Sequence, residues 1–174
     1  EQTVAPGGQA EFHAETTVSD PDLWGVYDSQ LYVVETQVQV DGRVTDTYRT
    51  DFGFRYMEFD SDSGFSLNEE HMKLKGVCMH HDQGALGAVD SKAAIRRQVE
   101  ILKDMGCNAI RVTHNPASRN LIEVCNEMGI LVIEEAFDGW LDPKNGNSRD
   151  YSRFFTQEIG GENEIIGRED GMTW

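Results

Sequence analysis

The chain has few basic residues and no long apolar run. Its 174 residues include 15 Lys and Arg against 31 Asp and Glu, which gives a formal net charge of −16. Binding to nucleic acid needs clustered Lys and Arg, so no nucleic-acid partner is expected. No apolar stretch approaches the roughly 20 residues of a membrane span, and residues 1–3 do not open a signal peptide. We therefore expect a soluble protein without a membrane partner, and the sequence leaves the cytoplasm and the periplasm open.

Cysteine is also scarce, and it does not follow a disulfide pattern. Cys78, Cys107 and Cys125 all lie inside segments with apolar periodicity rather than in loops. Such positions are typical of buried free thiols, so we expect no disulfide framework to hold this chain together.

Length and residue pattern divide the chain into two parts. Within residues 1–66, the pattern from about residue 12 to 65 is of the β type, with a hairpin of residues 31–40 and 43–48 around a turn at 41–42. A second alternating run covers residues 52–59. Sandwich domains usually contain about 100 residues, so we predict that residues 1–66 are a partial β-sandwich.

Residues 67–174 form the second part, in which strands and helices alternate until the regular pattern ends at about residue 149. Ser91 stands where it can cap a helix, and Gly106 and Gly129 stand where helices end in a left-handed residue. Strands and helices that alternate in this way form a parallel sheet with right-handed crossovers. A complete barrel needs at least about 200 residues, so we predict the first three βα units of a (β/α)8 TIM barrel. The strands are expected at residues 73–79, 107–112 and 130–133, and the helices at 91–105 and from near Pro116 to 128.

Each of these predicted strands ends in polar residues that can carry chemistry. In a βα barrel the carboxyl ends of the strands all point to one face, where catalysis is housed. Packing alone does not explain this repeated placement, so the three strand ends predict a binding face. The residues are His80 and His81 after the first strand, Arg111 and His114 at the second, and Glu134, Glu135, Asp138 and Trp140 after the third.

Strand alternation sends neighbouring side chains to opposite faces. His80 therefore shares a face with Cys78, while His81 points the other way and is expected to be structural. Glu134 and Glu135 are separated in the same way, so they cannot be the two facing carboxylates of an acid/base pair. His80 is expected to contact a ligand, and the alternative is a hydrogen bond at the barrel mouth.

Arg111 lies in an otherwise apolar strand, and a buried guanidinium needs a charged partner. Glu135 on the neighbouring strand is the expected partner, either in a structural ion pair or beside a bound substrate. His114 follows the same strand, just before Asn115 and Pro116. It is placed either to donate to a ligand or to brace the loop.

Asp138 and Trp140 follow the third predicted strand. The carboxylate of Asp138 can position a ligand or an ion, and an exposed Trp140 can stack on a sugar ring. The alternative for Trp140 is packing beneath the following loop. Two further functions stay open: a metal-dependent barrel hydrolase with His80, His114 and Glu135 or Asp138 as ligands, and a noncatalytic carbohydrate-binding fragment.

A longer stretch resembles a known family. The run Asn-Ala-Ile-Arg-Val-Thr-His-Asn-Pro at residues 108–116 and Gly-Ile-Leu-Val-Ile at 129–133 closely resemble a signature of glycoside hydrolase family 2, the β-galactosidase and β-glucuronidase family. The resemblance covers residues 20–153 and implies the passage from an immunoglobulin-like sandwich into the start of a TIM barrel. Asn115 replaces the tyrosine that is more common in the signature, and Glu69 stands where a turn glycine is usual.

The family resemblance implies a retaining hydrolase, β-galactosidase-like, that cleaves terminal β-galactosides of oligosaccharides by double displacement. His80 and His114 match histidines that line the sugar subsite of the family. Asp138 falls where some β-galactosidases carry a magnesium-binding glutamate, but Trp140 replaces the companion histidine. We therefore expect no metal site in this chain, while Mg²⁺ or Na⁺ in the parent enzyme and a homo-oligomer stay open.

Two carboxyl groups about 5 Å apart carry out retaining hydrolysis, one as acid/base and one as nucleophile. In the family they lie on the fourth and seventh barrel strands, and neither strand is recognisable in this sequence. Asn163 and Glu164 copy the dipeptide of the acid/base, but no apolar strand precedes them, which argues against Glu164. We therefore expect the chain to lack both catalytic glutamates and to be inactive alone, with Arg111 and Glu135 supporting the pocket.

Overall fold

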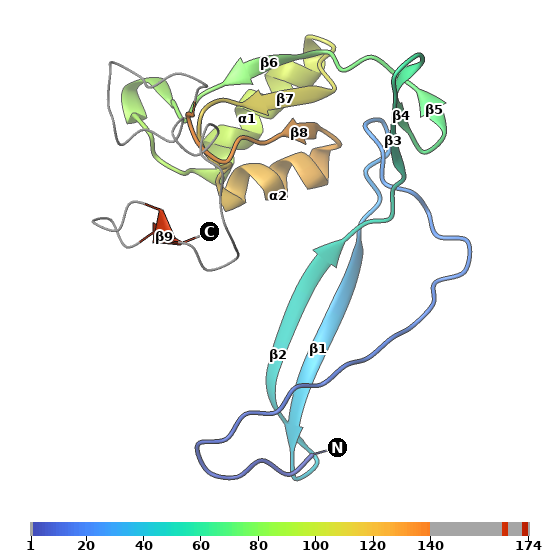
Figure 1. The fold of residues 1–174 in the computed structure, drawn as a ribbon, viewed down its shortest axis with the longest axis vertical. Helices are drawn as coiled ribbons and strands as arrows, with labels where there is room; N and C mark the ends of the chain where they lie inside the picture. The colour runs from blue at the N-terminus through green and yellow to red at the C-terminus, as the bar shows by residue number, and fades with distance from the viewer. Residues whose placement is uncertain (1, 140–164, 167–171, 174) are drawn as a thin grey trace. The chain divides into compact units, whose positions relative to one another are not determined.

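The computed structural model describes residues 2–139, 165–166 and 172–173 (Figure 1). Trp140 and Glu164, both singled out above, lie outside these residues. The two short C-terminal segments, β9 Ile165–Ile166 and β10 Met172–Thr173, pair as antiparallel strands. Among the described residues, no helix is long and apolar enough to cross a membrane.

Two compact units make up the chain, one ending at Lys73 and the other beginning at Leu74. The boundary expected after residue 66 falls inside strand β4, Gly64–Leu67, which pairs with β5, Glu70–His71. This pairing keeps both strands in the first unit. The assignment of the two parts to a sandwich domain and a barrel domain stays a prediction.

The first unit contains the hairpin that the sequence predicts. β1, Tyr32–Val40, pairs antiparallel with β2, Arg43–Phe52, and φ is positive at both turn residues, Asp41 and Gly42. Figure 1 shows the two strands as long arrows side by side. Nearly all side chains of both strands are exposed, so the backbone ladder and the turn hold this hairpin rather than a core.

A three-stranded antiparallel sheet forms another part of the first unit, in the order β3, Met57–Asp60, then β4 and β5. Trp24 is buried, and its carbonyl accepts a hydrogen bond from Asn68 Nδ2 at 3.0 Å. The Arg55 guanidinium lies 4.9 Å from the centre of the Trp24 ring. Two sheets are therefore present in this unit, and the partial sandwich stays a prediction.

The second unit is built around three parallel strands in the order β6, β7, β8. One helix follows β6 and another follows β7, so each crossover passes through a helix (Figure 1). The three strands and the two helices between them are present, and the helix that a third βα unit needs after β8 lies outside the described residues. Their bounds are β6 Gly76–Met79, the 3-10 turn η1 Gly84–Leu86, α1 Lys92–Asp104, β7 Ala109–Val112, α2 Arg119–Met128 and β8 Leu131–Ile133.

Local signals in the sequence set the helix ends. The side-chain oxygens of Ser91 and Ser118 each accept the N–H of the residue three positions further on, which caps α1 and α2. The second helix therefore begins after Ser118, and Pro116 stays outside it. Gly129 ends α2 in the left-handed conformation, with φ of 69°, as predicted.

One face of the parallel sheet packs on the helices, and the other face is open within the described residues. Cys78, Arg111 and Ile133 are aligned across the three strands on the open face. The expectation that all three cysteines are buried holds for Cys125 only. Cys107 is half-buried, and Cys78 is exposed because strand alternation places its side chain on this face. The core on the helix side contains Ile95, Val99, Ile110, Val112, Leu121, Val124, Cys125 and Ile130.

In the turn between β4 and β5, Glu69 adopts a backbone conformation that is unfavourable for glutamate. Asn68 and Glu69 have φ of 53° and 69°, and the flanking residues Leu67 and Glu70 pair directly. A two-residue hairpin turn with both φ positive is of type I′, which favours Asn followed by Gly. Gly42 meets this preference in the first hairpin, whereas Glu69 does not.

We predict that Glu69→Gly raises the free energy of unfolding by about 1 kcal/mol, because glycine adopts positive φ without a clash at Cβ. Gly42→Ala is the matched control at the other turn and should lower the free energy of unfolding by about the same amount. Urea unfolding followed by circular dichroism measures both. An unchanged or less stable Glu69→Gly protein would contradict the type I′ conformation.

We also predict that iodoacetamide labels Cys78 first and Cys125 last in the native chain. Cys78 is exposed, whereas Cys125 is 1% exposed, and burial raises the pKa of its thiol to about 12. The thiolate is the reactive form, so Cys125 is protected both by access and by ionisation. Mass spectrometry of the digested protein gives the order of labelling, and rapid native labelling of Cys125 would contradict the packing of α2.

Candidate functional site

Three strand ends bring the candidate site together. β6, β7 and β8 run parallel and in register, so the segments that leave their carboxyl ends start at the same edge of the sheet. His80, His114 and Glu135 lie in these three segments. The rings of His80 and His114 are 5.5 Å apart between their centres.

An ion pair joins β7 to the segment after β8. Arg111 Nε donates to Glu135 Oε1 at 2.7 Å, and a second guanidinium nitrogen contacts the same oxygen. The remaining nitrogen, Nη1, donates to Cys78 Sγ at 3.4 Å. The predicted partner of Arg111 is therefore confirmed, but the expected burial is wrong. The Arg111 side chain is 44% exposed because it lies on the open face of the sheet.

Glu135 also reaches the backbone of His114. Its Oε2 accepts the His114 N–H at 2.5 Å, so both carboxylate oxygens are engaged. The His114 N–H, and after it the Arg111 guanidinium, lower the pKa of Glu135 because both favour the ionised carboxylate. Glu135 is therefore a fixed negative charge near neutral pH.

His114 has an uncommon backbone conformation. Its φ is 75°, in the left-handed region that only about a few per cent of residues other than glycine adopt. Its Nδ1 lies 3.4 Å from Asp138 Oδ1 and 3.6 Å from Glu135 Oε2. The imidazole thus lies beside two carboxylates. The residue types around His114 give no sign of the positive φ, which the sequence analysis missed.

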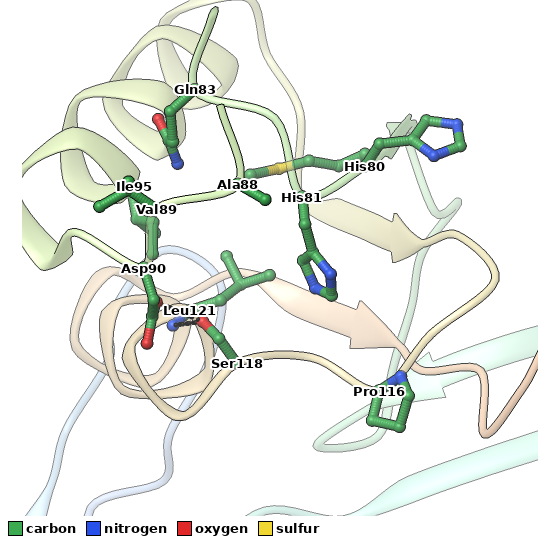
Figure 2. A pocket seen from close by; sticks show the side chains of 11 residues that line it. His80, His81, Gln83, Ala88, Val89, Asp90, Ile95, Pro116, Ser118 and Leu121 are labelled. Carbon is green, nitrogen blue, oxygen red and sulfur yellow. Dashed lines mark hydrogen bonds between the residues drawn. The ribbon is translucent and has the colours of Figure 1, made fainter. Parts of the chain in front are cut away.

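The sequence neighbours of these residues point away, as strand alternation predicts. Glu134 Oε1 accepts the N–H of Ala117 at 3.0 Å, just before α2. The two adjacent histidines also diverge, and Figure 2 shows the imidazoles of His80 and His81 directed to different sides. One residue of each adjacent pair therefore lies beside His114: Glu135 through its carboxylate and His80 through its ring.

Two hollows lie at this end of the sheet. The first encloses about 340 Å³ and is lined by the predicted residues Arg111, His114, Glu135 and Asp138, together with Ala136, Phe137 and Gly139. The second encloses about 240 Å³ between the segment after β6 and the first turns of α1 and α2, and both His80 and His81 line it (Figure 2). The structure therefore brings four predicted residues to the first hollow and places His80 in the lining of the second, in ring contact with His114. The aromatic ring of Phe137 was not predicted, because a single Phe after a strand carries no distinctive signal.

A metal-dependent site would need at least three ligands at one point. Across the part of the chain that the structure describes, no three His, Cys, Asp or Glu side chains are placed to hold a metal ion. The set considered above, His80 and His114 with Glu135 or Asp138, does not form such a group.

Comparison with known proteins gives agreeing matches in sequence. Residues 60–150 match the family model described as glycosyl hydrolases family 2, TIM barrel domain, and residues 1–55 match glycosyl hydrolases family 2. A beta-galactosidase of Bacteroides ovatus is 42% identical over 151 residues, which are 87% of this chain and 18% of that protein. A putative beta-glucuronidase of Formosa agariphila is 40% identical over 131 residues, 75% of this chain and 13% of that protein.

The fold has matches as well. The crystal structure of a beta-glycosidase from Bacteroides vulgatus matches with a TM-score of 0.68 at 42% identity, covering 78% of this chain and 17% of that one. This chain therefore spans less than a fifth of the length of these relatives.

Proposed function

The chain belongs to glycosyl hydrolase family 2, and we propose that it forms one wall of the sugar pocket in a retaining β-glycoside hydrolase of the β-galactosidase type. The observation that carries this proposal is the gathering of Arg111, His114, Glu135 and Asp138 around one hollow at the carboxyl ends of parallel strands. Barrel enzymes house their chemistry at this end. In this proposal residues 1–66 are part of an immunoglobulin-like sandwich, and the remainder is the start of the barrel.

The hollow offers groups that suit a sugar. Sugar hydroxyls donate and accept hydrogen bonds, and pockets recognise them with a few polar groups set beside apolar surface. The imidazole of His114 can donate or accept, the carboxylate of Asp138 accepts, and the ring of Phe137 supplies apolar area. These groups support direct contact between His114 and the substrate.

The charges of the hollow favour a neutral sugar over a uronic acid. The guanidinium of Arg111 is already paired with Glu135, and Asp138 adds a second carboxylate to the lining. The carboxylate of a glucuronide placed here would meet negative charge without gaining a new cationic partner. Of the two activities named for the relatives, this supports a β-galactoside as the substrate.

The glutamates at the end of β8 are suited to support rather than to catalysis. A general acid for glycoside hydrolysis needs a raised pKa, so that it holds its proton near neutral pH. The pKa of Glu135 is lowered and both of its oxygens are bonded, while Glu134 is turned toward α2. We therefore place the acid/base and the nucleophile on segments outside this chain.

We predict that the 174-residue chain alone does not hydrolyse nitrophenyl β-galactoside, while the protein extended to the length of its relatives does. Retaining hydrolysis needs two positioned carboxyl groups, and this chain supplies the wall beside them. Nitrophenyl β-glucuronide is the matched substrate and should show a kcat/KM at least about tenfold lower. Turnover by the 174-residue chain that disappears in Glu164→Gln would show that the catalytic pair has been misplaced.

In the same extended protein, His114→Ala should lower kcat/KM for the β-galactoside by about ten- to a hundredfold. The substitution removes a polar contact to the sugar and leaves the hydroxyl without a partner. His71→Ala, at an exposed histidine of β5, is the control and should leave kcat/KM unchanged. An His114→Ala enzyme with the wild-type kcat/KM would remove His114 from the sugar contacts.

A further inference from the structure

We propose that Glu135 is a positioning residue that clamps the backbone of His114 in its left-handed conformation and so sets where the imidazole lies in the hollow. That this imidazole contacts a sugar rests on the proposed function. The conformational control by Glu135 is a separate claim, and it can be tested without any activity.

The positive φ of His114 has to be stabilised by contacts with the surrounding residues. A Cβ atom next to the following carbonyl disfavours positive φ for a histidine, and such a conformation persists only where the surroundings impose it. The preceding residue, Thr113, is buried and fixed, since its N–H donates to Met79 O at 3.1 Å and its Oγ1 to the same oxygen at 3.2 Å. The chain must therefore turn directly after Thr113, and the His114 N–H turns toward Glu135.

Glu135 closes this turn from the neighbouring strand segment. Its Oε1 accepts a hydrogen bond from the guanidinium of Arg111, and its Oε2 accepts the N–H of His114 at 2.5 Å. Arg111 and His114 lie only three positions apart on the same segment, so one carboxylate joins both sides of the turn. Arg111 itself is held by Cys78 on β6, and the clamp therefore connects all three strand ends.

The clamp acts on the imidazole through the backbone. Asp138 Oδ1 and Glu135 Oε2 both lie beside Nδ1 of the ring, which also contacts the ring of His80. A change of φ at His114 to the ordinary negative range would turn the side chain away from these neighbours. Glu135 thus controls the proposed sugar contact without touching the sugar, which a simple structural ion pair between Arg111 and Glu135 would not do.

The His114 amide proton, followed by NMR in the full chain, gives a readout that a structural ion pair would not move. An N–H bonded to a carboxylate changes its chemical shift when that carboxylate takes up a proton. Because the pKa of Glu135 is lowered, the midpoint should fall below the ordinary value for a glutamate. The titration should be present in the wild-type chain and absent in Glu135→Gln.

Two variants serve as controls for this titration. Glu134→Gln removes the adjacent carboxylate, which binds the Ala117 N–H instead, and Asp138→Asn removes the other carboxylate beside the imidazole. Both should keep the titration of the His114 amide. A wild-type amide that does not titrate, or a Glu135→Gln amide that still does, would overturn the proposal.

Hydrogen exchange of the same amide at neutral pH decides the question where the chain does not tolerate acid. Exchange at His114 should be at least about tenfold faster in Glu135→Ala than in Glu134→Ala, because only the first removes the acceptor. Equal rates would overturn the proposal.

In the extended hydrolase, Glu135→Gln should raise KM for the β-galactoside by about tenfold with a smaller change in kcat, while Glu134→Gln changes neither. An unchanged KM would contradict the claim that Glu135 affects substrate binding through His114. If the extended protein hydrolyses no β-glycoside but the His114 amide behaves as predicted, the proposed function is wrong and the control of the His114 backbone by Glu135 is supported. If it hydrolyses the β-galactoside but the His114 amide does not behave as predicted, the proposed function is supported and the control by Glu135 is wrong.

Discussion

Parallel pairing of three strands in one register determines where every candidate site residue lies. The register turns the side chain of Ile110 toward the helices and that of Arg111 to the opposite face. A slip of one residue would exchange these faces, exposing Ile110 and forcing an unpaired guanidinium into the core. Both changes are costly, so the apolar packing of α1 and α2 on the sheet also fixes the strand ends that carry His80 and His114.

One carboxylate then connects this register to the hollow. Glu135 follows β8, yet its two oxygens bind the guanidinium of Arg111 and the backbone of His114, both from the β7 segment. The donors keep Glu135 ionised, and the ionised form is the one that accepts both hydrogen bonds. Because Glu135 stays ionised, it cannot act as a general acid, but it can keep its hydrogen bond to the His114 backbone.

Local signals were enough to predict most elements, because caps and turns are decided by neighbouring residues. Ser91 and Gly129 mark helix ends as expected, and the need of a guanidinium for a charged partner correctly paired Arg111 with Glu135. Alternation shows which side chains share a face but not whether that face is covered, and for this reason the expected burial of Cys78 and Arg111 was wrong. The positive φ of His114 depends on the path of a loop and on a carboxylate 21 positions away, which no local pattern contains.

Trapping the nucleophile tests whether this chain supplies the wall of the pocket while catalysis lies on other segments. A 2-deoxy-2-fluoro β-galactoside leaves its sugar covalently attached to the nucleophile of a retaining hydrolase. In the extended protein, peptide mapping by mass spectrometry should find the label on a glutamate outside residues 1–174. A label on Glu134, Glu135 or Glu164 would contradict the division between support and catalysis.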